Sequence, residues 1–207
     1  MFKNNKIYKI DKNCKRRRVF FVKGLSVKFK GSNSVIELHE PCIKFRASSI
    51  VCGDNCKISF GSKGVVRKLE IFATGANSEC YIGKDFCCTE NCSIVLNMES
   101  DKKVVIGDNC MFGSNILIRT SDGHSIIDKE TGKTLNLGKN IKIGNHCWLA
   151  TNVTVLKGVQ IADNSIIGYG SILTKDCDKP NSVYVGNPAK MVKTNIDWSS
   201  KPPRKEY

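Results

Sequence analysis

A histidine in a short polar stretch is the residue of this sequence best suited to proton transfer. His124 follows Ser121, Asp122 and Gly123. Histidine has an unperturbed pKa of about 6.5, so its imidazole gains and loses a proton readily near neutral pH. We therefore take His124 as the candidate general base. A solvated loop histidine is the alternative, and the elements around His124 must decide between the two.

A tryptophan and a group of cationic and hydroxyl side chains are candidates for holding a ligand. Trp148 lies between Cys147 and Leu149, whose spacing predicts burial, so strand alternation turns its indole outward. An outward indole is typical of a ligand site or a subunit interface. Side chains that could bind phosphate cluster near the end of the chain, with a solvated cationic surface as the alternative. They are Tyr169, Thr174, Lys175, Lys190 and Lys193.

The elements that position these residues follow a six-residue repeat. A helix would place apolar residues three and four apart, and a half-buried strand would alternate them. Here an aliphatic residue recurs at every sixth position, with Gly, Asn or Asp nearby to form tight corners. This period predicts a parallel β-helix, in which three units make one coil. The aliphatic positions are Leu137, Ile143, Leu149, Val155, Ile161, Ile167 and Leu173.

The repeat extends upstream and has a second inward phase four residues after the first. The upstream members are Ile82, Cys88, Ile94, Ser100, Ile106, Phe112 and Ile118, of which only Ser100 is polar. The second phase comprises Cys56, Cys92, Cys110, Ile116, Ile141, Cys147, Val153, Val159, Ser165 and Ser171. We therefore predict an all-β chain with a β-helix over residues 31–176. A basic capping segment, residues 1–30, precedes it, and a short cap and tail, residues 177–207, follow.

The repeat breaks once, between Ile118 and Leu137, which are 19 residues apart. The break predicts a loop that protrudes from the coil around residues 119–136. An irregular segment inside a regular scaffold is a typical place for function, and His124 lies within it. This setting favours the general base over the solvated histidine. His39 and His146 are assigned no role.

Cysteine is abundant, and its positions indicate packing. Six of the eleven cysteines fall on the inward phases: Cys52, Cys56, Cys88, Cys92, Cys110 and Cys147. Two pairs have a spacing that zinc sites use, but the pairs lie 36 residues, or two coils, apart. Two coils correspond to about 10 Å, whereas each thiolate of a zinc site lies about 2.3 Å from the metal. We therefore expect no metal site.

The oxidation state of these cysteines follows from the expected compartment. The longest apolar run near the N-terminus, Val19 to Val22, is too short for a secretory signal, which needs about 7 to 15 residues. We therefore expect a cytoplasmic chain with free thiols. No apolar run approaches the roughly 20 residues of a membrane-spanning helix, so we expect no integral membrane segment.

The charge balance favours an anionic partner. Lys and Arg total 33 against 19 Asp and Glu, a net charge of +14. With 41% hydrophobic and 25% charged residues, the composition excludes wholesale disorder and a collagen-like fibre. Charge alone does not distinguish a nucleic acid, an anionic membrane face, a phosphorylated cofactor or an acidic sugar polymer. The basic run at residues 12–18 lacks the interleaved aromatics of a nucleic-acid motif, so we expect no nucleic acid.

The repeat and its exit resemble a known family over roughly residues 50–193. The segments LGKNIKIGNHCWLATNVTVLKGVQIADNSIIGYGSILTKD and VYVGNPAKMVK are similar to hexapeptide-repeat acyltransferases. Within that family, SDGHSI, CWLA and PAKMVKTNIDW resemble the O-acetyltransferases of bacterial capsules and surface glycans, notably those acting on sialic acid polymers. The resemblance implies a left-handed coil, acetyl-CoA as cosubstrate, and a homotrimer with sites between subunits. The N-terminal part lacks the helical module of maltose acetyltransferases, which leaves a larger acceptor plausible.

The resemblance also implies roles for the catalytic candidates. His124 matches the general base, which removes the proton of an acceptor hydroxyl as its oxygen attacks the thioester directly, without an acyl-enzyme. Trp148 matches a tryptophan near the active centre.

The resemblance assigns the remaining candidates to the coenzyme. Thr151 matches a small residue that lines the pantetheine tunnel, and Thr174 and Lys175 match coenzyme contacts after the last coil. Lys190 and Lys193 match a basic phosphate region. The sequence departs from the family at Ala150, where many members have glycine, and at Tyr169, where a small residue is common beside the coenzyme. These departures concern the path of the coenzyme.

We therefore expect an acetyl-CoA-dependent O-acetyltransferase that modifies a hydroxyl of a bacterial surface glycan. The acceptor that we expect is anionic, with sialic acid as its candidate sugar. An N-acetyltransferase acting on a nucleotide-linked amino sugar is the alternative within the same fold. A metal-dependent hydratase would need three histidines around zinc, but only His124 and His146 lie in the repeat. A non-catalytic β-helix that binds glycans or assembles with other proteins is the alternative of another class.

Overall fold

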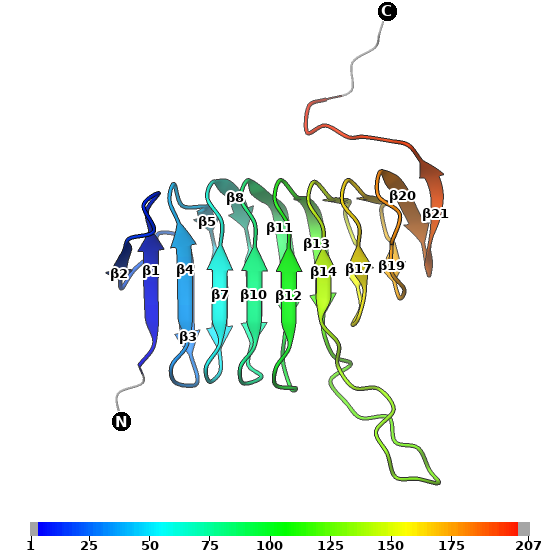
Figure 1. The fold of residues 1–207 in the computed structure, drawn as a ribbon, viewed down its shortest axis with the longest axis horizontal. Coiled ribbons are helices and arrows are strands. Elements are labelled where there is room, and N and C mark those ends of the chain that lie inside the picture. Colours follow the sequence, from blue (N-terminus) through cyan, green and yellow to red (C-terminus); the bar gives the residue numbers. More distant parts are fainter. Residues whose placement is uncertain (1–3, 203–207) are drawn as a thin grey trace, which may run out of the picture.

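The computed structural model describes residues 4–202, which form a stack of parallel coils built from strands and turns (Figure 1). One sheet has eight strands, in the order β17-β14-β12-β10-β7-β4-β1-β2. Its strands are β1 (Lys6–Ile10), β2 (Arg16–Val19), β4 (Val35–His39), β7 (Lys57–Phe60), β10 (Glu79–Ile82), β12 (Lys103–Ile106), β14 (Ile141–Ile143) and β17 (Gln160–Ile161). The predicted parallel β-helix is confirmed.

The other sheet has thirteen strands and bends around one corner, so it covers two of the three faces of the prism. The bend lies within the long strands β11 and β13. The first half of β11 pairs with β8 and the second half with β9. The strands of this sheet are β3 (Leu25–Phe29), β5 (Lys44–Arg46), β6 (Ser48–Cys52), β8 (Gly64–Arg67), β9 (Leu69–Ala73), β11 (Phe86–Val95), β13 (Met111–Arg119), β15 (Trp148–Leu149), β16 (Thr154–Val155), β18 (Ile166–Ile167), β19 (Ile172–Leu173), β20 (Ser182–Gly186) and β21 (Ala189–Thr194).

Both inward phases of the repeat form the core. Because the coils pair in parallel register, equivalent side chains stack directly, as Cys80 does between Ile58 and Val104. Every member of the second phase is buried, and so is every member of the first phase except two. Ser100 is exposed in a corner, and Leu137 is 63% exposed. The prediction for Leu137 is wrong because the coil resumes only at β14, after the loop.

The corners are stabilised by a left-handed backbone and by ladders of polar side chains. Asn91, Asn115 and Asn152 have φ values of 54°, 57° and 61° at equivalent corners. Asn91 Nδ2 donates to Asn115 Oδ1 at 3.3 Å, and Asn115 Nδ2 donates to Asn152 Oδ1 at 3.0 Å. Asparagine tolerates this conformation, and its side-chain amide can hydrogen-bond the asparagine of the next coil, so it suits this row of corners.

The predicted loop is confirmed. The chain leaves the stack after β13, which ends at Arg119, and re-enters it at Ile141 (Figure 1). Within the loop Ile127 and Thr134 form an antiparallel bridge, and the Leu135 N–H donates to the Ile126 carbonyl at 2.8 Å. The loop therefore has a hairpin-like structure of its own.

Each end of the stack carries an antiparallel strand pair. At the N-terminal end β2 pairs with β1, which pairs in parallel with β4, while β3 pairs with β6. Strands from residues 1–30 are thus already rungs of both sheets. At the other end β20 and β21 form a hairpin, after which the tail runs back along the stack (Figure 1).

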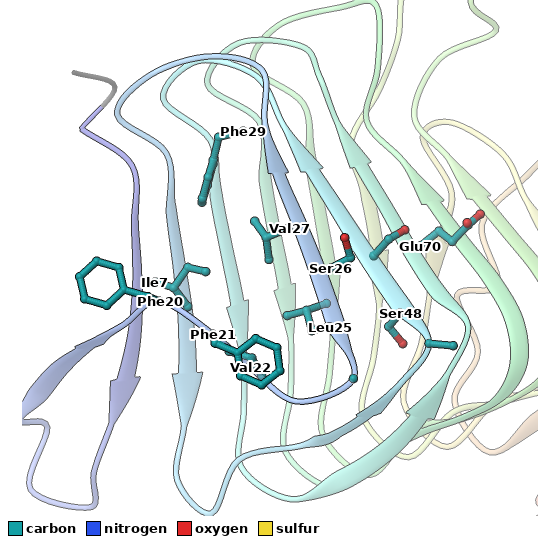
Figure 2. A pocket seen from close by; sticks show the side chains of 13 residues that line it. Ile7, Phe20, Phe21, Val22, Leu25, Ser26, Val27, Phe29, Ser48 and Glu70 are labelled. Atoms are coloured by element: carbon teal, nitrogen blue, oxygen red, sulfur yellow. The ribbon is translucent and has the colours of Figure 1, made fainter. Parts of the chain in front are cut away.

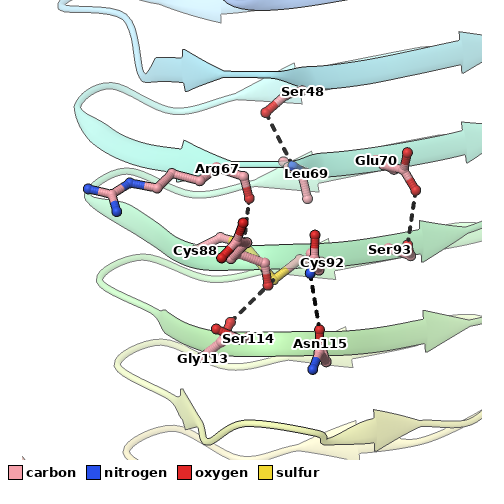
Figure 3. Close-up of a disulfide and its surroundings, with 12 residues drawn as sticks. Ser48, Arg67, Leu69, Glu70, Cys88, Cys92, Ser93, Gly113, Ser114 and Asn115 are labelled. Atoms are coloured by element: carbon pink, nitrogen blue, oxygen red, sulfur yellow. Dashed lines mark hydrogen bonds between the residues drawn. A yellow bond between two sulfur atoms is a disulfide. The ribbon is translucent and has the colours of Figure 1, made fainter.

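The interior holds one feature that the sequence did not indicate. All six cysteines on the inward phases are buried, as predicted. However, Cys88 and Cys92 form a disulfide inside β11, whereas we expected free thiols (Figure 3). The two residues flank the corner at Asn91, and because both side chains point inward their sulfurs meet.

Two further predictions concern metals and membranes. Among residues 4–202, no group of three His, Cys, Asp or Glu side chains is arranged to hold a metal ion. Within the same range, no helix has the length and apolar character needed to cross a bilayer.

Candidate active site

The loop that carries His124 borders a cavity of about 320 Å³ at the foot of the protrusion. His124 is exposed at the rim of this cavity. The wall includes Met98 and Glu99 from the preceding coil, Ser121 from the start of the loop, and Asn136 and Leu137 from its end. The exposure of Leu137 is thereby explained, because its side chain lines the cavity instead of the core.

One carboxylate fixes both ends of the loop. Glu99 Oε1 accepts a hydrogen bond of 2.7 Å from the Ser121 hydroxyl, and Glu99 Oε2 accepts one of 2.7 Å from the Gly138 N–H. Lys102 Nζ lies 3.8 Å from Oε2. The Ser121 hydroxyl, and then the Gly138 N–H, hold the pKa of the Glu99 carboxyl below its usual value. Glu99 is therefore ionised at neutral pH and acts as a clamp.

A second anchor holds the segment next to His124. Asp122 forms an ion pair with Lys157, which comes from the next corner along the same edge of the prism. Asn136 Nδ2 donates to Asp122 Oδ2 at 2.8 Å and to the His124 carbonyl at 2.9 Å. Lys157 Nζ also donates to the Asn136 carbonyl at 2.7 Å. The backbone of His124 is thus tied to the far side of the loop, while its side chain remains exposed.

The ionic anchors predict how the loop responds to acid. Lys157, and then Asn136, hold the pKa of Asp122 below its usual value, and the pKa of Glu99 is also lowered. A depressed carboxyl pKa gives stability that is present above the unfolded pKa, about 4, and is lost as the pH falls through the folded value. We expect the thermal midpoint, followed by circular dichroism, to fall below about pH 4. The fall should be smaller in Asp122→Asn, and the exposed Asp178→Asn should match the unmodified chain. A fall of equal size in Asp122→Asn would contradict this assignment.

Trp148 lies on another face and is partly covered by the tail of its own chain. Its indole is half-buried on β15. The Trp198 ring lies 5.9 Å from it and stacks on the His146 ring at 4.3 Å and 9°. Trp198 Nε1 donates to the His146 carbonyl at 2.7 Å, and His146 Nε2 lies 3.2 Å from Asp197 Oδ1. Part of the cover that we assigned to a ligand or a subunit is therefore supplied by this tail.

His124 and Trp148 lie on different parts of the prism. The His124 loop leaves the corner between the end of β13 and β14, whereas Trp148 pairs with Met111 at the beginning of β13. The two positions are separated by a full face of the coil.

The candidates for binding a coenzyme lie in the last coils. The Thr151 hydroxyl occupies a corner, where it accepts a hydrogen bond of 3.3 Å from the Ser114 N–H. Tyr169 is 70% exposed, and its hydroxyl accepts one of 2.7 Å from Asn152 Nδ2. Tyr169 thus extends the asparagine ladder by one rung. These two side chains follow each other along one edge of the prism.

The cationic candidates and Thr174 lie nearer the C-terminal end. Thr174 and Lys175 are exposed in the turn after β19, on the same edge of the prism as Lys157. Lys190 and Lys193 are exposed on β21, opposite Val185 and Val183 of β20. All four side chains are accessible to an anion.

Sequence reasoning missed three residues that position His124, namely Glu99, Asn136 and Lys157. A signal was present for Glu99, because the neighbouring Ser100 is the single polar member of the upstream phase. The unit that contains it departs from the repeat, and Glu99 within it contacts both ends of the loop. Trp198 lies at the end of the segment PAKMVKTNIDW, which resembles the family, but that resemblance did not indicate that its ring would cover Trp148.

Comparison with known proteins agrees with this architecture. Residues 140–175 match the family model described as bacterial transferase hexapeptide (six repeats). The polysialic acid O-acetyltransferase of Neisseria meningitidis is 33% identical over 193 residues, which cover 83% of this chain and 88% of that protein.

Solved structures extend the similarity to almost the whole chain. The polySia-specific acetyltransferase NeuO superposes with a TM-score of 0.68 at 28% identity, covering 98% of this chain and 82% of that one. The polysialic acid O-acetyltransferase OatWY gives 0.52 at 28% identity, covering 99% and 90%. The parallel coils are compatible with the left-handed winding that the resemblance implied. On the extent of these similarities, the chain belongs to the hexapeptide-repeat O-acetyltransferases.

Proposed function

We propose that this protein transfers the acetyl group of acetyl-CoA to a hydroxyl of an anionic glycan that contains sialic acid. The observation that carries the proposal is the position of His124, exposed at the rim of a cavity on a doubly anchored loop. Similarity to the N. meningitidis polysialic acid O-acetyltransferase spans 83% of the chain and supports the acceptor class. The net charge of +14 complements a polymer that carries one carboxylate per sugar.

The chemistry requires a base but no covalent enzyme intermediate. The neutral His124 imidazole accepts the proton of the acceptor hydroxyl as its oxygen forms a bond to the thioester carbonyl carbon. The tetrahedral oxyanion then collapses, the carbon–sulfur bond breaks, and the departing thiolate takes the proton back from the imidazolium. An acetyl ester and CoA are the products. An anchored loop favours this step because the imidazole must stay within hydrogen-bond reach of the hydroxyl.

The coenzyme is proposed to lie along the last coils. Lys175, Lys190 and Lys193 would pair with its phosphates, while Thr151, Tyr169 and Thr174 would contact its uncharged part. These six side chains lie between the corner after β15 and strand β21.

A homotrimer accounts for the separation of the catalytic candidates. His124 and Trp148 lie on different parts of one prism. We propose that adjacent copies bring the His124 loop of one chain against the Trp148 face of the next, so that each site forms between subunits.

An acceptor screen tests the proposed function. Purified protein and acetyl-CoA are incubated with polysialic acid, with a neutral galactoside, or with a nucleotide-linked amino sugar, and released CoA is measured with a thiol reagent. A blank without acceptor corrects for the exposed thiols of Cys14 and Cys87. We expect CoA release that depends on polysialic acid and a product whose acetyl group is removed by mild alkali, as an ester is. Faster turnover of the amino sugar to an alkali-stable amide would contradict the proposal.

A further inference from the structure

A basic and aromatic surface at the N-terminal end of the stack is not used by the proposed reaction. We call residues 12–23 the N-terminal tip; they comprise the end of the β1–β2 turn, β2, and most of the connection to β3. Phe20 and Phe21 in this tip are 84% and 77% exposed, the highest values among the exposed large hydrophobic residues of the described range 4–202. Aromatic rings are normally buried because each removes about 150–250 Å² of surface from water. Two adjacent exposed rings are therefore a candidate contact surface.

The rings do not cap the open end of the coil. A cavity of about 850 Å³ lies at this end, lined on the inside by Ile7, Leu25 and Val27 (Figure 2). Phe20 and Phe21 border the same cavity. At their high exposure they cover little of its wall, which has apolar members near the rings and polar members, Ser26, Ser48 and Glu70, on the side of β3, β6 and β9.

The segment that carries these rings is rich in positive charge. Residues 12–30 contain eight basic and no acidic side chains: Lys12, Lys15, Arg16, Arg17, Arg18, Lys23, Lys28 and Lys30. Arg16 pairs with Glu37 at 2.6 Å and Arg17 with Glu40 at 3.5 Å, yet their side chains remain 57% and 68% exposed. The Arg18 guanidinium lies 5.1 Å from the centre of the Phe20 ring. Arg18 thus brings a cation directly against one of the exposed rings.

We propose that the N-terminal tip binds the surface of an anionic lipid bilayer. Phe20 and Phe21 enter the headgroup region, and the surrounding Lys and Arg side chains contact lipid phosphates and carboxylates. A bilayer interface accepts apolar rings and attracts positive charge at the same place. A hydrated acidic polysaccharide satisfies the charge but offers no apolar phase for two neighbouring rings. The lipid surface therefore fits both observations.

This placement is compatible with catalysis. The tip lies at one end of the stack, whereas the His124 loop leaves it several coils away (Figure 1). A chain held by its tip would therefore keep the His124 loop away from the lipid surface, in water. The inference goes beyond the proposed function and does not depend on the acceptor.

Vesicle sedimentation with the full chain tests the proposal. One set of vesicles is phosphatidylcholine alone, and the other contains about 30% phosphatidylserine. We expect binding to the anionic vesicles, weakened by salt, and at least about tenfold weaker in the Phe20→Ser/Phe21→Ser variant. The triple variant Lys12→Gln/Lys15→Gln/Lys23→Gln should also bind the anionic vesicles more weakly. The matched control, Met191→Ser/Val192→Ser, removes exposed apolar side chains from β21 at the other end and should bind as the unmodified chain does.

Three results would overturn the proposal. The first is equal sedimentation of the phenylalanine variant and the unmodified chain, or no sedimentation with either kind of vesicle. The second is that the phenylalanine variant no longer binds immobilised polysialic acid but still sediments with vesicles as the unmodified chain does, which would make the tip a glycan site. The third is a self-association in light scattering that only the phenylalanine variant loses, which would make it a contact between copies. Acetyl transfer to a soluble acceptor is measured separately for the phenylalanine variant and should equal that of the unmodified chain. A failure of the membrane proposal is therefore distinguishable from a failure of the proposed function.

Discussion

Replacing His124 with alanine is expected to reduce kcat for acetyl transfer by about 10²–10⁴-fold, the usual contribution of a positioned general base. A sugar hydroxyl is a weak nucleophile, and without the imidazole its proton must go to water. The KM for each substrate should change little, because His124 acts mainly in the transition state. Steady-state kinetics with acetyl-CoA and the acceptor identified by the screen measures both quantities.

The structure offers a matched control for this variant. His39, at the end of β4, lies on the eight-stranded sheet, and His39→Ala should retain full activity. His124 is exposed, so its replacement should leave the thermal midpoint unchanged. Activity of His124→Ala within tenfold of the unmodified protein, with the same thermal midpoint, would exclude His124 as the base.

Replacing Glu99 with alanine is expected to lower kcat/KM by about 10–100-fold, even though Glu99 acts only by holding the loop that carries His124. The variant removes the acceptor of the Ser121 hydroxyl and the Gly138 N–H together. Hydrogen bonds to charged groups contribute about 1.5–3 kcal/mol each, so both ends of the loop would be released. A displacement of about 1 Å at the base costs about 10²-fold in rate, which sets the upper end of this range.

Trypsin provides a readout of the loop itself. Lys129 and Lys133 lie near its tip, and cleavage there should accelerate in Glu99→Ala without a matching fall in the global thermal midpoint. Glu99→Gln keeps an acceptor oxygen for Ser121 and should restore part of the activity. Glu130→Ala, which removes an exposed carboxylate from the same loop, is the control and should be active. If trypsin cleaves the loop of Glu99→Ala no faster than that of the unmodified protein, and the two proteins have the same kcat/KM, then the Glu99 contacts do not position the loop.

Most of the scaffold could be predicted because its determinants are local. Each corner needs a residue that tolerates a left-handed backbone, and each flat segment places one aliphatic side chain inward, so the period of six appears directly in the chain. Ile143, Leu149, Val155 and Ile167 are all at most 1% exposed, as the repeat predicted. Because the period is regular, its one interruption was recognisable in the sequence, and His124 lies within that interruption.

The repeat could not predict where an interruption ends or what meets across a corner. Counting in sixes assigned Leu137 to the core, but the loop's own hairpin delays the return of the chain to β14. Cys88 and Cys92 were both assigned inward, correctly, yet the period carries no information on whether two inward sulfurs at one corner approach each other.

The sequence alone therefore determined the coiled architecture, the inward side chains and the loop that holds the candidate base. Only the tertiary structure decided how that loop is held and what covers Trp148. Glu99 contacts residues 22 and 39 positions away, Lys157 one 35 positions away, and Trp198 one 52 positions away. Stacking coils and a returning tail bring such residues together, and their separations depend on the lengths of every loop between them. A local period contains no record of those lengths, so these contacts emerge only when the whole stack is assembled.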